Sequence, residues 1–294
     1  MRSQAISAVN SSPASPESNL RGGSTGGHSQ GSRIRTRESW RQSWADRLGP
    51  PLAFVALICA WEAACRFFAI PSFLLPTPSA IVEAGIKIPL SQWAANIGAT
   101  LRVALMGYAV AILVSIPLAV ALVSSRFLSR TLYPMLVIVQ STPIVAIAPI
   151  IVVTMGASDL PRVFITFLIT FFPIVVSTVT GLLATPEELI ELSRSLRAGR
   201  VREMLHIRLP FAVPFIFSAL KISTTLAVIG AVVAEFVAAE HGLGFFIMFS
   251  TSFFKIAQAF AGLAVLVALS LVLFRLCSLA QWWLVPWSLP KGQR

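Results

Sequence analysis

Long apolar runs dominate the chain after residue 48. Six of them are long enough to cross a bilayer, because a membrane-spanning helix needs about 20 residues. They cover residues 51–70, 99–123, 132–155, 161–184, 211–233 and 257–282. Internal prolines do not exclude helices here, because neighbouring helices can satisfy the freed backbone groups. The runs also lack the two-residue alternation of barrel strands. The pattern therefore predicts an all-α membrane protein with a six-helix transmembrane bundle over residues 49–294.

Residues 1–48 differ from the rest of the chain. They are rich in Ser, Gly and Arg and show no apolar periodicity. A segment of this composition cannot bury enough apolar surface to offset its conformational entropy, so we expect a disordered, basic cytoplasmic tail. Trp40 and Trp44, just before the first apolar run, would suit a short interfacial helix. The tail has no apolar stretch of the kind that a secretory signal peptide contains.

Composition and charge support the membrane interpretation. Hydrophobic residues make up 56% of the chain and charged residues only 12%, whereas soluble domains carry about 25% charged residues. In a soluble protein the net charge of +11 would suggest a nucleic-acid partner. In a membrane protein it first reflects Lys and Arg on the cytoplasmic side. The opposite segments hold few basic residues, namely Arg66, Lys87, Arg162 and Lys255. We therefore expect both termini in the cytoplasm and no nucleic acid.

The residues that usually carry metal or catalytic chemistry are few and scattered. The three cysteines lie inside apolar runs and lack metal-ligand spacing. The histidines lie in three separate segments, at His28, His206 and His241. The chain also lacks the G-x-x-x-x-G-K-[ST] loop that binds ATP. We expect no metal site, no cofactor and no catalytic residue, and hence a protein that is not an enzyme.

The main polar interruption of the membrane region covers residues 185–208. Thr185, Pro186 and Glu188 predict a helix start, as N-cap, first helical residue and capping-box glutamate. Apolar residues at helical spacing then predict two short amphipathic helices with a break near Gly199. Such a cytoplasmic segment, with its five arginines, can dock into a groove of a soluble partner. It can equally pack against the bundle or the lipid surface, and the residues alone leave both open.

This interruption resembles the coupling loop of the permease subunits of bacterial ABC importers. Glu191, then Arg197-Ala198, then Ile207-Arg208-Leu209-Pro210 follow the spacing of that family's Glu-Ala-Ala, Gly and Ile-x-Leu-Pro motif. Leu192 and Ser193 replace the two alanines. Arg197 replaces the glycine that permits a bend in the family, and Gly199 could move the bend by two residues.

Further matches place the chain in the nitrate/sulfonate/taurine branch of these permeases. They occur in order over about residues 55–285: Trp61-Glu62, Phe73 to Ser79, Thr100-Leu101-Arg102, Ile116-Pro117-Leu118, Pro143, Pro149, Gly156, Ala234-Glu235 and Gly242-Leu243-Gly244. The resemblance implies the type I ABC importer permease fold with a cytoplasmic coupling helix, in the bacterial inner membrane. It implies as partners separate ABC ATPase subunits, an extracytoplasmic solute-binding protein and a second permease subunit, which we expect to be another copy of this chain.

The function implied by the resemblance is ATP-driven import of a small, anionic solute, such as a sulfonate, taurine or nitrate, by alternating access. Nitrogen heterocycles and aromatic acids also fit this branch. The implied ATPase-coupling residues are Glu187, Glu188, Glu191, Leu192, Arg197, Ala198, Gly199, Leu205, Ile207, Leu209 and Pro210. An ion-gradient-driven secondary transporter, which would need broken helices in two related halves, is the alternative. A membrane scaffold without transport is a weaker one.

Polar residues inside the spans could line the translocation path. The candidates form two triplets, Gln140, Ser141 and Thr142 before Pro143, and Ser223, Thr224 and Thr225 in the fifth span. Hydroxyls of this kind also often bond only to their own helix backbone. Glu62 and Arg66 have the spacing of a helical ion pair. We expect Glu235 at a solvated helix end, with a gate or a contact to the binding protein as the alternatives.

Overall fold

The structure is a computed structural model that describes residues 35–156 and 158–288. The chain divides into two units, residues 1–57 and 58–294, and each is described by itself. Helix α1 (Arg35–Phe67) begins in the first unit and ends in the second. Residues 35–48 belong to the segment expected to be disordered apart from a short helix around Trp40 and Trp44, and all of them are helical. The rest of the predicted tail, residues 1–34, lies outside the described residues.

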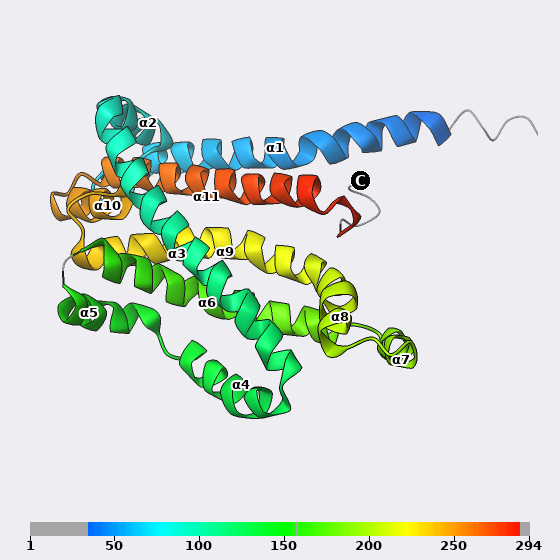
Figure 1. The fold of residues 1–294 in the computed structure, drawn as a ribbon. Helices are drawn as coiled ribbons and strands as arrows, with labels where there is room; N and C mark the ends of the chain where they lie inside the picture. Colours follow the sequence, from blue (N-terminus) through cyan, green and yellow to red (C-terminus); the bar gives the residue numbers. More distant parts are fainter. Residues whose placement is uncertain (1–34, 157, 289–294) are drawn as a thin grey trace, which may run out of the picture. The chain divides into compact units, whose positions relative to one another are not determined.

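Within the described part, every regular element is a helix (Figure 1). After α1 the helices are α2 (Pro78–Ile86), α3 (Leu90–Ser124), α4 (Arg126–Gln140), α5 (Ile144–Met155), α6 (Asp159–Leu183), α7 (Glu187–Ser195), α8 (Arg200–Glu203), the π-helical turn η1 (Met204–Arg208), α9 (Leu209–Ala238), α10 (Leu243–Ser252), α11 (Ile256–Leu284) and the 3₁₀ turn η2 (Pro286–Ser288). This agrees with the predicted all-α class.

Four described helical stretches are long and apolar enough to cross a membrane. They are α3, α6, the continuous stretch Arg200–Ala238 that ends in α9, and α11. Three of them contain a whole predicted run, and α6 contains all but the last residue of the run 161–184. A further crossing would run through α4 and α5, which meet at an angle of 94°. The predicted run 132–155 is thus broken, because Pro143 lacks the N–H that a continuous helix needs. Residues 51–67 of the first run, 51–70, fall in α1, which is not among these four.

Helix α6 forms the centre of the second unit, with α3 and α9 packed against it. Gly107 of α3 and Gly230 of α9 allow these two helices to pack closely against the same residue of α6, Thr166. A Cβ on Gly107 of α3 would lie 2.5 Å from the Thr166 Cβ, and one on Gly230 of α9 would lie 2.9 Å from the Thr166 Cα. Small residues at helix interfaces let membrane helices pack closely. Thr166 is accordingly fully buried between its two neighbours.

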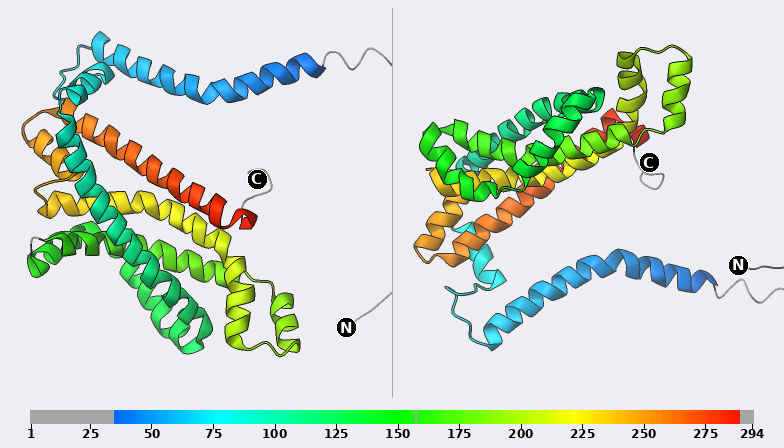
Figure 2. Two further views of the ribbon diagram at one scale, coloured as in Figure 1. Left: turned by 45° about the horizontal axis from the view of Figure 1, so that its top comes forward. Right: turned by 90° about the horizontal axis from the view of Figure 1, so that it is seen from below.

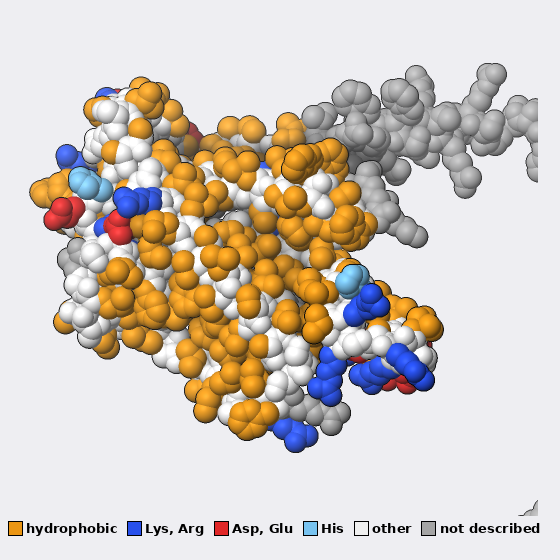
Figure 3. All heavy atoms as spheres, in the orientation of Figure 1, with side chains coloured by type: hydrophobic (Ala, Val, Ile, Leu, Met, Phe, Trp, Pro, Cys, Tyr) orange, Lys and Arg blue, Asp and Glu red, His pale blue; other side chains and the backbone are white. Residues whose placement is uncertain are grey.

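The two ends of the second unit carry different elements. Helices α2 and α10 pack on α11 at one end, and α7 and α8 project from the other end (Figures 1 and 2). Hydrophobic side chains cover the middle of the visible face, and charged side chains gather toward the ends, with several Lys and Arg around α7 and α8 (Figure 3). The predicted orientation would place the α7 and α8 end in the cytoplasm.

Candidate functional site

Residues 185–208, here called the coupling segment, fold as a helical hairpin. Helix α7 runs out from the end of α6, and α8 with η1 runs back beside it into α9 (Figure 2). The return arm has no break, since residues from Arg200 to Ala238 form one continuous helical stretch. A displacement of the hairpin would therefore be passed directly to α9.

The start of α7 differs from the predicted cap. Thr185 was expected to be the N-cap, but the residue before the helix is Pro186, and no side chain caps it. The buried Thr185 hydroxyl instead donates a hydrogen bond to the carbonyl oxygen of Leu182, at 3.2 Å. The last carbonyls of a helix have no intrahelical partner. Thr185 therefore satisfies the end of α6 rather than the start of α7.

The turn between the two arms lies at Arg197, and the idea that Gly199 carries the bend is wrong. Arg197 has a φ of 56°, whereas Gly199 has an ordinary extended conformation with φ −67° and ψ 157°. The N–H of Ala198 bonds to the Ser193 carbonyl at 3.0 Å, and the N–H of Arg197 to the Arg194 carbonyl at 2.9 Å. These two bonds define a Schellman motif, in which the left-handed residue is usually glycine.

A buried ion-pair cluster joins the two arms of the hairpin. The carboxylate of Glu203 accepts a hydrogen bond from Arg208 Nε at 2.9 Å and lies 3.5 Å from Arg194 Nε. Arg208 also donates to the Leu182 carbonyl oxygen at 3.4 Å. The side chains of Glu203 and Arg208 are only 10% and 15% exposed, whereas that of Arg194 is 66% exposed. The cluster ties α7, α8 and η1 to the end of α6.

Sequence reasoning missed Glu203. It lies five residues before Arg208, a separation that is not a neighbour spacing on an α-helix. The intervening turn η1 is π-helical, and its i to i+5 bonding brings residues five apart toward one face. The π-helical turn brings Glu203 and Arg208 together, and the local sequence pattern does not predict such a turn.

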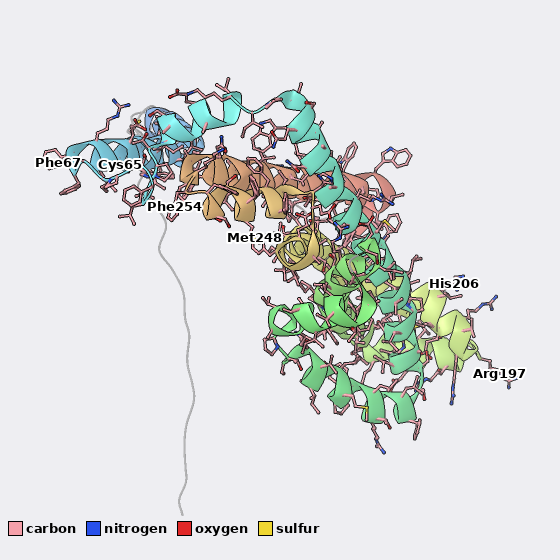
Figure 4. The ribbon with its side chains drawn as sticks, turned by 90° about the vertical axis from the view of Figure 1, so that its left-hand side faces the viewer. Cys65, Phe67, Arg197, His206, Met248 and Phe254 are labelled. Atoms are coloured by element: carbon pink, nitrogen blue, oxygen red, sulfur yellow. The ribbon has the colours of Figure 1, made fainter. Side chains whose placement is uncertain are left out.

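The outward side of the coupling segment presents apolar side chains. Five of them are exposed, namely Leu189, Leu192, Leu196, Val201 and Leu205. Between α7 and the start of α9 lies an apolar groove of about 400 Å³, which His206 also lines. Arg197 and His206 both lie at this end of the molecule, and Arg197 points away from the bundle (Figure 4). A water-exposed apolar face of this kind marks an interaction surface.

Nine of the eleven predicted ATPase-coupling residues lie on this hairpin, and Leu209 and Pro210 begin α9. Glu187, Glu188, Glu191, Leu192, Arg197, Gly199, Leu205 and Pro210 are exposed, and Ala198, Ile207 and Leu209 are partly buried. Glu187 and Glu188 occupy the first turn of α7, where acidic side chains are favourable to the helix dipole. The prediction of their role in coupling stays a prediction.

The two triplets predicted for the translocation path lie on separate elements. Ser141 and Thr142, at the bend between α4 and α5, donate to carbonyl oxygens of α4 at 2.9 and 3.4 Å. In α9, Thr224 donates to the Lys221 carbonyl oxygen at 2.7 Å, and Ser223 is fully buried. These three bonds are the local backbone bonds considered as the alternative. Of the six residues, Thr225 lines a groove between α9 and α11.

At the opposite end of the unit, three side chains cap the start of α10. Gly242 N–H bonds to Asn96 Oδ1 at 3.1 Å, Leu243 N–H to Thr100 Oγ1 at 2.8 Å, and Gly244 N–H to Glu235 Oε2 at 2.7 Å. The expectation that Glu235 lies at a solvated helix end is wrong, because it is fully buried. Its carboxylate is placed there because the first N–H groups of a helix need acceptors.

Glu62 plays a similar part at α2. Its carboxylate accepts the Ser79 N–H at 3.0 Å, the Ser79 hydroxyl at 2.8 Å and Arg66 Nε at 2.7 Å. The predicted pair with Arg66 is therefore present. Glu62 and Glu235, the two acidic residues of the matched motifs outside the coupling segment, thus each accept a hydrogen bond from an N–H in the first turn of a short helix. This contact brings Glu62 and Ser79 together.

A family comparison agrees with this architecture. Residues 111–287 match the family described as binding-protein-dependent transport system inner membrane component. The match begins inside α3 and ends after α11, so it includes the coupling segment and, of the three residues that cap α10, Glu235.

Several characterised proteins are similar over most of the chain. The riboflavin transport system permease protein RibX of Chloroflexus aurantiacus is 35% identical over 86% of this chain and 94% of its own length. The formylaminopyrimidine transport permease protein ThiX of Halalkalibacterium halodurans is 34% identical over 82% of this chain and 96% of its own length. The taurine transport system permease protein TauC of Escherichia coli is 25% identical over 85% of this chain and 94% of its own length.

A solved structure shares the fold. A chain of the methionine ABC transporter MetNI, determined in inward-facing conformations, superimposes with a TM-score of 0.54 and 19% sequence identity. The superposition covers 69% of this chain and all of that chain. This likeness identifies the fold as that of type I ABC importer permeases.

Proposed function

We propose that this chain, which belongs to the family of binding-protein-dependent transport system inner membrane components, is moved by a separate ATPase through its coupling segment. The family identifies the chain as a permease subunit of an ABC importer, located in the inner membrane and not an enzyme. ATPase and binding-protein partners follow from the family. The proposal concerns how this particular chain meets them and which solute it carries.

The observation that best supports docking to an ATPase is the exposed apolar hairpin at the α7 and α8 end. Leu192, Leu196 and Leu205 are 56%, 74% and 52% exposed in a segment that protrudes from the bundle (Figure 1). Lipid does not account for this exposure, because the same hairpin carries Glu187, Glu188 and Glu191 on α7, which are costly to insert into a bilayer. A protein groove with apolar floor and basic rim would accommodate both kinds of side chain.

The hairpin is built to transmit a displacement. The Glu203 cluster joins its two arms to the end of α6, and its return arm continues without interruption into α9. Helices α6 and α9 pack along their length with glycine contacts. When ATPase subunits closed on the hairpin, α9 and α6 would move together, and a rigid-body rotation of this kind can switch the side to which a pathway opens.

Replacement of one exposed leucine tests the docking proposal. In the complex with its ATPase, Leu196→Asp should abolish ATPase co-purification and ATP-driven uptake, because a charge would enter the apolar contact. Leu74→Asp is the matched control, since Leu74 is 70% exposed at the opposite end of the unit. It should retain the ATPase. If Leu196→Asp bound the ATPase and transported as well as the unmodified chain, the hairpin would not be the coupling element.

We also propose that the solute carries a nitrogen heterocycle. RibX and ThiX, which are 35% and 34% identical to this chain, are named as permeases for riboflavin and formylaminopyrimidine. The groove that Thr225 lines supports a ring-shaped solute, because its other lining residues include Ser270 and ten apolar residues, and no charged residue. A small anion, such as the taurine carried by TauC or nitrate, is the second candidate.

Uptake by the reconstituted complex separates the two solute classes. Radiolabelled riboflavin, a formylaminopyrimidine, taurine and nitrate would each be offered with the binding protein encoded beside this chain. We expect saturable uptake of a heterocycle and none of the two anions. Uptake of taurine or nitrate alone would show that the solute is an anion and not a heterocycle. The proposed coupling to the ATPase would be unaffected by that result. We further expect the complex to contain two copies of this chain, with both termini cytoplasmic.

A further inference from the structure

A second cavity lies on the inward side of the coupling segment. Its volume is about 960 Å³, and it separates the hairpin from the ends of α3 and α6. The residues that decide its chemistry are Ser124, Ser125, Leu183, Arg194, Arg200 and Arg208. This cavity shares no lining residue with the apolar groove proposed to meet the ATPase, although Ala198, one of the predicted coupling residues, lines it.

The charges around the cavity do not balance. Three arginines line it, against one carboxylate, that of Glu203. Both oxygens of that carboxylate are already engaged by Arg208 and Arg194. The side chain of Arg200 forms no hydrogen bond or ion pair with the residues that the structure describes. The cavity therefore has a net charge of +2 and an unused guanidinium, which can bind a phosphate in a bidentate manner.

The cavity also lies at the boundary of the membrane region. Helix α3 ends at Ser124 and α6 at Leu183, and both helices are membrane-spanning. Leu183 is 61% exposed and Phe127, in the first turn of α4, is 75% exposed. The start of α4 follows Ser125 directly, and the N-terminus of a helix favours anions. A polar, positively charged cavity thus lies near exposed apolar side chains at the ends of two apolar helices.

We propose that this cavity binds a phosphate-bearing anion, presented by the headgroup of an anionic phospholipid or by free phosphate. The phosphate would contact Arg200 and Arg194, and the acyl chains of a lipid would lie along Leu183 and Phe127. Basic pockets of this kind on the cytoplasmic side bind anionic headgroups. Such a ligand would connect the hairpin to the ends of α3 and α6, so membrane composition would influence the coupling segment. The proposal depends on the cytoplasmic orientation of this end but not on docking to an ATPase.

The test uses the full chain alone, purified in a neutral detergent. The midpoint of thermal unfolding is followed in mixed micelles containing dioleoylphosphatidylglycerol or dioleoylphosphatidylcholine, and separately with inorganic phosphate, at fixed salt. The variants are Arg200→Gln and the double variant Arg194→Gln/Arg200→Gln. Arg202→Gln is the matched control, because Arg202 is an exposed arginine of the same short helix that does not line the cavity. Lipid phosphorus that co-purifies with each variant is a second readout independent of stability.

We expect saturable stabilisation of the unmodified chain by phosphatidylglycerol and none by phosphatidylcholine. The double variant should need at least tenfold more phosphatidylglycerol and lose bound phosphorus, while Arg202→Gln stays within twofold of the unmodified chain. If inorganic phosphate stabilises the unmodified chain but not the double variant, and competes with the lipid, free phosphate is the source. Without such competition the lipid is the source.

Two results would overturn the proposal. Equal losses for Arg202→Gln and the double variant would mean a general attraction between a basic surface and anionic micelles. Unchanged binding of phosphatidylglycerol and of phosphate by the double variant would mean that the arginines of this cavity do not hold the anion. Neither result depends on whether Leu196 contacts the ATPase.

Discussion

The Glu203 cluster should make the two arms of the coupling segment move as one body. Glu203→Gln keeps the shape of the side chain but removes the charge that pairs with Arg208 and Arg194. The two contacts are unequal. Arg208 is 15% exposed and 2.9 Å from the carboxylate, whereas Arg194 is 66% exposed and 3.5 Å away. The structure therefore assigns most of the interaction to Arg208.

The magnitudes follow from burial. Removal of one partner of a buried ion pair costs about 3–5 kcal/mol, because the other charge is left uncompensated. An exposed pair contributes about 1 kcal/mol or less. We expect Glu203→Gln and Arg208→Gln each to destabilise the hairpin by about 3 kcal/mol, and Arg194→Gln by less than about 1 kcal/mol. Double-mutant cycles would then give a large coupling energy for the first pair and a small one for the second.

Hydrogen exchange measures this locally. The backbone N–H groups of Arg197 and Ala198 close the turn, and their exchange should accelerate about a hundredfold in Glu203→Gln, which corresponds to nearly 3 kcal/mol. ATP-driven uptake should fall as well, because a loosened hairpin transmits less of the ATPase movement. The reasoning is refuted if Arg194→Gln accelerates exchange as much as Arg208→Gln, or if Glu203→Gln leaves the exchange of the turn unchanged.

Three further substitutions test other parts of the structure. Arg197→Gly should stabilise the turn by roughly 1 kcal/mol or less, because it removes a left-handed non-glycine residue but adds freedom to the unfolded chain. Slower hydrogen exchange of the Ala198 N–H would show this stabilisation. Faster exchange would argue against the positive φ of Arg197. Gly230→Ala should destabilise the bundle by about 1–3 kcal/mol through its clash with Thr166. Gly98→Ala, with open space around its Cβ, should be neutral or stabilising, and equal unfolding midpoints for the two alanine variants would contradict the close packing. Glu235→Ala should lower the unfolding free energy by about 1–3 kcal/mol, because the Gly244 N–H loses its buried acceptor; Glu235→Gln can retain that bond, and an equally large loss in both variants would count against the capping role.

The membrane class and most spans could be predicted because they rest on length and apolarity alone. The runs 99–123, 211–233 and 257–282 each fall inside one long helix, and the run 161–184 extends one residue beyond α6. The run 132–155 was expected to be one helix, and the structure bends it by 94°. Pro143 was visible in the sequence, but membrane helices often tolerate proline. Whether such a residue breaks a helix depends on neighbouring packing, which a single sequence does not contain.

The site shows the same limit at the level of single residues. The position of the coupling segment and its two short helices could be predicted from the helical spacing of its leucines. The turn at Arg197 could not, because glycine is the usual left-handed residue and Gly199 is two positions away. Here the two backbone bonds of the turn outweigh the cost of a left-handed arginine. Glu203 and Glu235 were missed or misplaced because their partners come from a π-helical turn and from distant helices.

Uptake in proteoliposomes tests whether this chain is driven by a separate ATPase or by an ion gradient. The full complex, with its ATPase and binding protein, would be reconstituted with labelled solute, and ionophores would dissipate all ion gradients. We expect uptake to continue with ATP under ionophores, to require ATP hydrolysis, and to be lost in the Leu196→Asp variant but not in Leu74→Asp. Uptake without ATP that disappears when the ionophores are added would contradict this expectation.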